Sequence, residues 1–517
     1  MEQEVSTMSK DAGPLRWNLL TASVCLLCIA GTGCVQERPA VPTLAIVGVA
    51  VVDVDNGMTL RNQTVLVAAN RITGVGARDS VPIPAGAQVV EAEGRFLIPG
   101  LWDMHTHLID PDIPGGLEVV LPLLVANGVT GVRDMGSSSL DSIVELRRAV
   151  RDGDVLGPRI VLAGKVLDGL PVVFPPDEIV VRTAAEAVKA VDSLATRGVD
   201  FIKLYEMLPR DVFVAAMEAA KERGLPVAVH VPLTMDASEV SKLGVRSVEH
   251  LRNIELACSG QADSLRLART ETLVREAAQP DAAIKAFDWS KGYGSGALVR
   301  GAIHSAQRPL ARATYDPNRC RKLLAQFAEK GTWQVPTLFL VASAHFRPDT
   351  MRSVRETLRY VPAANREPWE RDAAAPIAPN DGRGGGDAQA KWYVDLVHEL
   401  KAAGVGILAG TDISNPWMVP GFSLHEEMQA LVAAGLTAHE ALQAATVQPA
   451  RYFEATDSLG AVARGRIADL VLLDGNPVLD IRNTRRIRAV ILNGRYLDRA
   501  ALDALLQGAA VAAAAAR

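Results

Sequence analysis

Six side chains that can bind a metal ion stand at or near the ends of short apolar segments of β type. They are His105, His107, Lys203, His230, His250 and Asp412. His105 and His107 are separated by one residue, so on a strand both imidazoles would point to the same side and could hold one ion. Metal ions bound in this way activate water for hydrolysis. The residue types and their spacing therefore indicate a hydrolytic metal centre.

Each of these residues also has an ordinary structural interpretation. A single His in an apolar segment is commonly a hydrogen-bonded core residue, a Lys there usually extends its amine to solvent, and an Asp after Gly-Thr often caps a helix. The coincidence of six such residues at the same end of five predicted strands favours the metal site. The other histidines show no such placement, and we assign them no role in the site: His304, His345, His398, His425 and His439.

The elements that must position these residues alternate between apolar strands and amphipathic helices, a pattern typical of an α/β fold with a parallel sheet. Helices are predicted at residues 184–196, 210–223 and 423–434. Eight strands are predicted, at residues 98–107, 129–134, 159–163, 201–205, 227–231, 247–251, 332–338 and 405–412. This number fits a (β/α)8 TIM barrel over residues 98–454. A doubly wound open sheet is less favoured, because no Gly-rich phosphate loop follows the first strand.

The segments on either side of the barrel are rich in Val and Ile, with Asn and Gly turns between them. Residues 35–97 and 455–500 are each too short to fold alone, so we predict one small β-sandwich built from both chain ends. Two long insertions, at residues 252–331 and 340–398, are expected to form lids or substrate-binding elements. The Ala-rich tail (residues 501–517) is predicted to end in a frayed or disordered segment from residue 508.

The segment Pro99–His107, with Lys203, His230, His250 and Asp412 in that order, resembles the amidohydrolase superfamily of metal-dependent hydrolases. Within it, the chain is most similar to imidazolonepropionase-like proteins and bacterial Xaa-Pro or Xaa-Arg dipeptidases. The resemblance extends over roughly residues 44–500 and includes the two-ended β-sandwich. One departure is that Lys203 lacks the Gly-Gly turn that often follows the corresponding lysine, so close substrate analogy with imidazolonepropionase is weakened.

This resemblance implies a role for each of the six residues. His105, His107 and Asp412 would hold one divalent ion, His230 and His250 a second, and Lys203, carboxylated by CO2, would bridge them. A hydroxide bridging the two ions would attack the substrate, with Asp412 as the catalytic base and then acid. Zinc is the expected metal of a His-rich site.

We expect the substrate to be a small amide that bears a carboxylate, such as a dipeptide or an N-acyl amino acid. Tyr205 lies on the same side of its strand as Lys203 and could hydrogen-bond the substrate, while Arg252 follows His250 closely and could pair with the carboxylate. Lactone, carbamate or phosphoester hydrolysis on the same site is the alternative, and a non-catalytic binding lipoprotein is a remote one. The net charge of −5 and the absence of a long basic run argue against nucleic acid as a partner. The oligomeric state stays open.

The first 34 residues have the pattern of a secretory signal peptide. Lys10 and Arg16 precede an apolar run of roughly 14 residues, too short for the about 20 that span a bilayer. Gly31-Thr32-Gly33-Cys34 resembles a lipobox, so we expect a periplasmic protein, with a possible outer-membrane lipid anchor on Cys34 as its membrane link. Cys25 and Cys28 fall within the signal. The remaining Cys258 and Cys320 are far apart in the sequence and are predicted to be two unrelated thiols.

The anchor can be tested by changing Cys34 to Ser. Because the thiol would carry the lipid, wild-type protein should fractionate with membranes, whereas the variant should be released or retained unprocessed. Soluble wild-type protein in the periplasmic fraction would rule out the anchor.

Overall fold

The computed structural model describes residues 43–110, 113, 115–175, 177–277, 294–343, 352–374, 386–413 and 415–516. Residues 41–517 form one compact unit. The predicted signal peptide and Cys34 lie outside the described residues. Within the described ranges, no helix has the length and hydrophobicity needed to cross a membrane.

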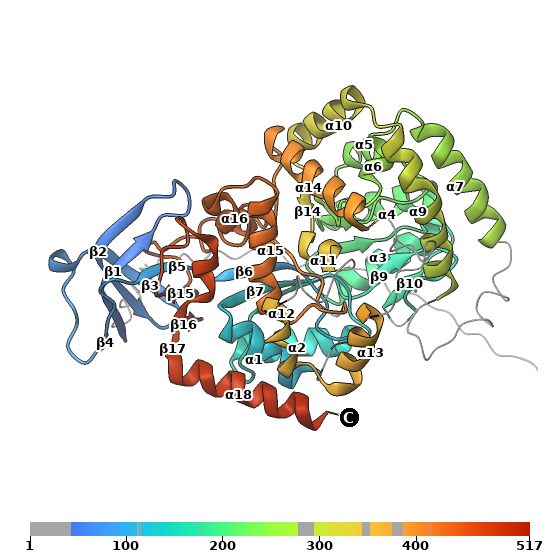
Figure 1. Cartoon of the computed structure of the whole chain (residues 1–517). Helices are drawn as coiled ribbons and strands as arrows, with labels where there is room; N and C mark the ends of the chain where they lie inside the picture. Colours follow the sequence, from blue (N-terminus) through green and yellow to red (C-terminus); the bar gives the residue numbers. More distant parts are fainter. Residues whose placement is uncertain are drawn as a thin grey trace, which may run out of the picture. The chain divides into compact units, whose positions relative to one another are not determined.

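Both ends of the described chain contribute strands to one eight-stranded sheet, in the order β17-β16-β15-β5-β1-β2-β3 with β4 beside β1. These strands are β1 (Leu44–Val52), β2 (Thr59–Ala68), β3 (Arg71–Ala77), β4 (Gln88–Glu91), β5 (Phe96–Pro99), β15 (Leu470–Leu473), β16 (Ile487–Leu492) and β17 (Arg495–Leu497). The two ends meet where β5 pairs antiparallel with β15, with Phe96 opposite Leu473 and Pro99 opposite Leu470. Figure 1 shows the blue and red segments of this sheet together. The prediction that both ends share one β unit agrees with this pairing.

A second set of strands is parallel throughout. One sheet has the order β6-β7-β8 and the other β10-β9-β11-β12-β13-β14. The strands are β6 (Leu101–Thr106), β7 (Val129–Asp134), β8 (Arg159–Leu162), β9 (Val166–Asp168), β10 (Glu178–Val180), β11 (Ile202–Leu204), β12 (Val227–Val229), β13 (Ser247–Glu249) and β14 (Trp333–Val335). The predicted α/β class with parallel strands is confirmed.

Two predicted strands differ from the structure. The predicted strand at residues 98–107 is divided at Gly100 into the end of β5 and the start of β6. A Cβ at this position would lie 1.9 Å from Oγ1 of Thr130, so a residue with a side chain would clash there. Residues 405–412 do not form a regular strand: Ile407 makes one isolated bridge, to Gln334, and Ile413 just beyond the segment makes another, to Thr106. The backbone of residues 405–412 still exchanges two hydrogen bonds with Gln334 of β14 on one side, and bonds Met104 and His105 of β6 on the other.

The helices cover the parallel strands (Figure 1). They are α1 (Leu117–Ala126), α2 (Leu140–Asp152), α3 (Ala184–Thr196), α4 (Arg210–Glu222), α5 (Ala237–Lys242), α6 (Ile254–Ala257), α7 (Ala262–Ala277), α9 (Ser295–Ala313), α10 (Pro317–Lys330), α11 (Leu338–Ser343), α12 (Arg352–Arg355), α13 (Ala363–Ala374), α14 (Gly386–Ala402), α15 (Phe422–Ala433), α16 (Ala438–Ala444), α17 (Val447–Tyr452) and α18 (Arg499–Ala515). The three helices predicted from the sequence correspond to α3, α4 and α15 within one residue at each end. Local signals explain such ends: the side chain of Thr183 caps α3 by accepting the N–H of Glu186.

For the Ala-rich end, where a frayed helix or disorder is predicted, the described residues form a helix, and its packing contradicts disorder. Residues Arg499–Ala515 form α18. The residue before it, Asp498, is the N-cap, and its side chain accepts the N–H of Ala501. Leu502, Ala509 and Ala513 are buried, and α18 lies against α1. Alanine has the highest helix propensity, and its small side chain permits close packing between helices. A segment that looks featureless in the sequence therefore forms a packed helix.

The prediction that Cys258 and Cys320 are unrelated thiols is also wrong, because the two form a disulfide across 62 positions of sequence. Both cysteines are fully buried, Cys258 at the end of α6 and Cys320 in α10. Backbone hydrogen bonds join the same two places: Asp316 N–H donates to the carbonyl of Cys258, and Gly260 N–H to that of Thr314. The disulfide thus closes the base of the insertion that carries α7 and α9.

We expect the paired substitution Cys258→Ala and Cys320→Ala to lower the free energy of unfolding by about 2–4 kcal/mol, since the cross-link restricts the unfolded chain. Urea unfolding of the oxidised wild type and the variant measures the loss, and reduction should lower the wild type to the level of the variant. Peptide mapping without reduction that found two separate free thiols would contradict the disulfide.

Candidate metal centre

The six predicted ligand residues come from ends of the parallel strands and lie in one buried region. His105 and Lys203 belong to β6 and β11, His230 and His250 directly follow β12 and β13, and Asp412 ends the irregular segment 405–412. Five of them are buried, whereas the side chain of His107 is 18% exposed. Strands β11, β12 and β13 are parallel neighbours in register, so their carboxyl ends fall at the same edge. The predicted convergence agrees with this arrangement.

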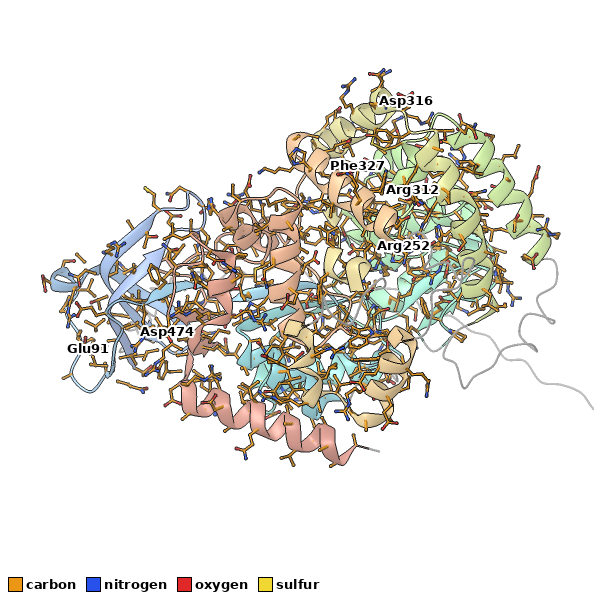
Figure 2. All side chains as sticks on the ribbon, viewed as in Figure 1. Glu91, Arg252, Arg312, Asp316, Phe327 and Asp474 are labelled. Atoms are coloured by element: carbon orange, nitrogen blue, oxygen red, sulfur yellow. A yellow bond between two sulfur atoms is a disulfide. The ribbon has the colours of Figure 1, made fainter. Side chains whose placement is uncertain are left out.

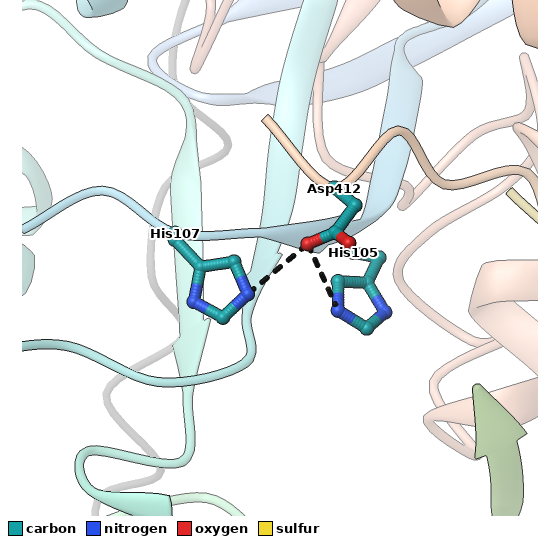
Figure 3. A group of neighbouring side chains, drawn as sticks. All are labelled: His105, His107 and Asp412. Atoms are coloured by element: carbon teal, nitrogen blue, oxygen red, sulfur yellow. Dashed lines mark ion pairs between the residues drawn. The ribbon is translucent and has the colours of Figure 1, made fainter. Parts of the chain in front are cut away.

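His105, His107 and Asp412 form the tightest group, with one ligand atom from each lying within 4.8 Å of the other two. Figure 3 shows both imidazoles turned toward the carboxylate of Asp412. Oδ1 of Asp412 is 3.4 Å from Nε2 of His105 and 3.2 Å from Nε2 of His107. Two imidazole nitrogens and one carboxylate oxygen that lie this close together are a suitable donor set for a divalent transition metal.

His230 and His250 adjoin this group. Nε2 of His250 is 3.6 Å from Oδ2 of Asp412, and the ring centroids of His250 and His105 are 4.4 Å apart. The ring of His230 follows at 4.8 Å from that of His250. Asp412 therefore lies between the two pairs of histidines, where its two oxygens face different rings.

Every one of the four histidines is held through its Nδ1 atom. Nδ1 of His105 bonds Glu249, Nδ1 of His230 bonds Glu206, and Nδ1 of His107 donates to the carbonyl of Gly136, each at 2.8 Å. Nδ1 of His250 donates to Thr337 at 2.7 Å, because the hydroxyl of Thr337 itself donates to the carbonyl of Pro336. Protonation at Nδ1 leaves Nε2 with its lone pair free, the tautomer that a metal ligand needs.

Glu249 is in turn fixed by a buried arginine. Arg133 of β7 donates to both carboxylate oxygens of Glu249, at 2.9 and 2.8 Å, and its other N–H groups bond Met104, Ser247 and Tyr452. Burial would raise the pKa of Glu249, but the charge of Arg133 and the hydrogen bond to His105 together outweigh it and hold the pKa well below its usual range. Glu249 is therefore ionised and orients His105.

Lys203 has the environment least compatible with an ordinary lysine. Its side chain is buried, and its Nζ has no hydrogen-bond partner among the described residues. Burial lowers the pKa of this amine to about 8. An unpaired buried ammonium is costly, so this amine gives up its proton more readily than an exposed lysine does.

Opposite pKa shifts affect the two residues that share a 3.2 Å contact. Burial would raise the pKa of Asp412, yet the neighbouring His105 and His250 and the hydrogen bond from His107 hold it well below its usual range. Burial would lower the pKa of His107, but the hydrogen bond and charge of Asp412 raise it to about 10. The carboxylate of Asp412 thus stabilises positive charge beside it.

The backbone is strained at two of the strand ends that carry ligands. His250, Leu251 and Asp412 have φ values of 55°, 52° and 59°, in the left-handed region that residues other than glycine rarely adopt. Such residues cost of order 1–3 kcal/mol each and persist where the surrounding structure imposes them, commonly at functional sites.

The two predicted substrate-binding residues lie beside His230. The ring centroids of Tyr205 and His230 are 4.1 Å apart, and Arg300 donates to the Tyr205 hydroxyl at 2.9 Å. The side chain of Arg252 is 24% exposed, and its Nε is 3.8 Å from Oε1 of Glu206.

Sequence reasoning missed the residues that orient the ligands. Glu206, Glu249 and Arg133 are fully buried, and only the position of Glu249 directly before His250 hinted at a role. His304, to which the sequence assigned no role, lies at the margin of the site with its Nε2 3.0 Å from Glu206.

Comparison with known proteins places these observations in a family. A sequence profile of the Amidohydrolase family matches residues 96–276 and 393–497. The solved structure of bottromycin amidohydrolase superposes with a TM-score of 0.67 and 25% identity over 92% of this chain and 91% of that chain. A prolidase structure from Bifidobacterium longum, described as putative, has a TM-score of 0.63 and 23% identity over 91% of this chain and 100% of that one, a likeness of fold alone.

Curated sequences match over shorter segments. A dihydroorotase from Geobacter sulfurreducens is 31% identical over 151 residues, which are 28% of this chain and 33% of the relative. An adenine deaminase from Paracoccus denitrificans is 35% identical over 103 residues, 17% of each protein. The alignments thus span a third or less of these curated relatives.

The profile match takes in each of the six residues predicted as ligands and more than half of the chain. It also confirms the family predicted from the motif around His105 and His107. This protein therefore belongs to the amidohydrolase family of hydrolases.

Proposed function

We propose that this protein is a metal-dependent hydrolase that uses two divalent ions to cleave the amide bond of a small substrate bearing a carboxylate, such as a dipeptide or an N-acyl amino acid. The observation that carries the proposal is that four histidines are each bonded through Nδ1, and that three of them, His105, His107 and His250, direct Nε2 toward the Asp412 carboxylate. A structural histidine has no need of this orientation. Four together favour metal binding.

The residues present fit a pair of metal ions. His105, His107 and Asp412 would hold one, and His230 and His250 the other, with zinc as the expected metal. The unpaired Nζ of Lys203 supports a bridging role after carboxylation, in which the amine nitrogen bonds to the carbon of CO2 and releases one proton. This reaction turns a group that repels cations into a carboxylate that binds them. Bound ions would polarise the scissile carbonyl and lower the proton affinity of a water molecule.

The remaining chemistry belongs to the chain. The low pKa of Asp412 keeps its carboxylate ionised, so it can accept the proton of the attacking water and return it to the leaving nitrogen. Tyr205 and Arg252 lie on the His230 side of the site, where we propose that they bind the substrate carboxylate. The guanidinium fork suits a carboxylate in two-point contact.

We further infer that the parallel strands close into the predicted (β/α)8 barrel and that the terminal sheet packs as the predicted sandwich. Hydrogen bonds at both gaps between the parallel sheets support the barrel. Residues 405–412 bond β14 and β6, and Asp200, just before β11, donates to the carbonyl of Leu162 in β8 at 2.8 Å.

For location, we propose export to the periplasm. The buried Cys258–Cys320 disulfide supports this, because such bonds form and persist in oxidising compartments.

The metal centre is tested by Lys203→Ala. Since the variant lacks the proposed bridge, it should lose at least one of the two ions found in the wild type by elemental analysis, along with most activity on amide substrates. Short-chain carboxylic acids should restore part of both by replacing the bridge. Lys189→Ala, which removes an exposed lysine of α3, is the control and should change neither. Full metal content and activity in Lys203→Ala would contradict the two-ion site.

The proton-transfer role is tested by Asp412→Asn. Because the amide cannot accept the proton but keeps an oxygen toward the metal, kcat should fall by roughly two to four orders of magnitude, with less metal loss than in His105→Ala. In the wild type, kcat/KM should fall toward low pH as Asp412 becomes protonated. The variant should lack this acidic limb. A variant with near-normal kcat would show that another group moves the proton.

A further inference from the structure

The insertion closed by the disulfide carries a series of basic side chains on α9. Two of them, Arg300 and His304, contact Tyr205 and Glu206 at the margin of the candidate metal centre. Arg300, His304, Arg308 and Arg312 follow one another at four-residue spacing on α9, which places them on one face of that helix. The three arginine side chains are only 15–21% exposed. Arg252, just before α6, and the fully buried Arg269 of α7 lie in the same region, and Figure 2 labels Arg252 and Arg312 there.

Two carboxylates among the described residues pair with this group. Glu206 lies 3.6 Å from Arg300 and 3.8 Å from Arg252, and also bonds His230 and His304. Glu255 lies 2.9 Å from Arg308 and 3.8 Å from Arg312.

Of the five arginines in this region, Arg269 differs from the other four because it is not paired with a carboxylate among the described residues. Arg269 bonds the neutral amides of Asn253 and Gln307 and forms no ion pair within the described part of the chain. Burial, with the charge of Arg308 next, lowers the pKa of His304 well below its usual range, so this ring is neutral.

Two further acids face Arg300, but they do not restore the balance. Burial raises the pKa of Glu178 to about 7 and that of Asp168 well above its usual range. Neither supplies a full negative charge at neutral pH. Five largely buried guanidinium groups therefore lie beside two paired carboxylates, Glu206 and Glu255, and buried charges of one sign are costly unless a partner compensates them.

This excess of positive charge adjoins the proposed catalytic residues. Arg300 donates to the hydroxyl of Tyr205, whose ring lies against His230, and Glu206 contacts both Arg300 and His230. Each guanidinium has five N–H donors, more than these contacts use. The helix α9 also lies between the two matched segments of the family profile, so the profile does not cover its arginines, whereas Arg252 and Arg269 fall within the first matched segment.

We propose that Arg300 and Arg308 of α9 form a second anion-binding subsite, so that the enzyme acts on amides that carry two carboxylates, such as N-acyl-glutamates or dipeptides with an acidic residue. The first carboxylate contacts Arg252 and Tyr205, and the second contacts the α9 arginines. The hydrolysis of such diacids rests on the proposed function, whereas the binding of a second carboxylate does not.

Binding is tested on the metal-loaded wild type by calorimetry with glutarate and with its monoamide, glutaramate, which has one charge fewer. Glutarate should bind tighter by about tenfold or more, the usual worth of a charge-assisted hydrogen bond. Equal affinities would overturn the subsite. No variant has to fold for this comparison.

Substitutions then assign the effect to α9. Arg300→Met and Arg308→Met should each reduce the preference for glutarate, and Arg308→Lys, which keeps the charge, should retain part of it. Arg275→Met removes an arginine of the same insertion whose side chain is 64% exposed, and it should leave the preference intact. A preference that survives in the Arg300→Met and Arg308→Met proteins would overturn the assignment.

Kinetics separates the two proposals. The wild type should hydrolyse N-acetyl-glutamate with a kcat/KM about tenfold or more above that for N-acetyl-glutamine, and Arg308→Met should remove the difference by acting on the diacid alone. Amide hydrolysis without such a preference would overturn the second subsite and leave the proposed function standing. Selective binding of glutarate without hydrolysis of any amide would overturn the proposed function and leave the second subsite standing.

Discussion

The buried ion pair between Arg133 and Glu249 is the interaction on which the rest of the site depends. It joins β7 to β13, two strands that are not neighbours in either parallel sheet, and it reaches α17 through the hydroxyl of Tyr452. Glu249 orients His105 on one side and directly precedes His250 on the other. One pair thus positions ligands from both halves of the proposed two-metal site. Removal of either partner would leave an uncompensated buried charge, which typically costs about 3–5 kcal/mol.

Buried carboxyl groups in this protein divide into two classes according to their partners. Glu206, Glu249 and Asp412 face arginines or histidines, and their pKa values stay low despite burial. Asp103 and Glu427 are equally buried but depend mainly on neutral donors, and burial raises the pKa of Asp103 to about 7 and that of Glu427 to about 8. Burial alone therefore does not decide ionisation. Close pairing with several histidines or arginines keeps the pKa values of Glu206, Glu249 and Asp412 low, whereas Glu178 and Asp168, which face Arg300, still have raised pKa values.

The positions of the proposed ligand residues were predictable because strand geometry is local. Alternation places His105 and His107 on one side of β6, and the ends of parallel strands bring Lys203, His230 and His250 together without further knowledge of the fold. The residues that orient them were not predictable, because Arg133 and Glu249 meet only through tertiary packing across 116 positions of sequence.

The remaining differences have a similar origin. The cysteine pair depends on how the two ends of an insertion meet, and the Ala-rich tail on whether a complementary helix face exists. Neither property is encoded in a short segment. Residues 405–412 fall between these cases, since their apolar pattern predicted a strand and their backbone keeps hydrogen bonds to both neighbouring strands, but they do not form a regular ladder.

The disulfide between Cys258 and Cys320 also changes the topology of the molecule. The chain between the two cysteines is a covalently closed ring, which the rest of the protein joins at Cys258 and at Cys320. A single break of the backbone anywhere in this ring leaves both pieces joined through sulfur. A protease cut in the insertion would thus leave α9 covalently attached to the part of the protein that carries the proposed site.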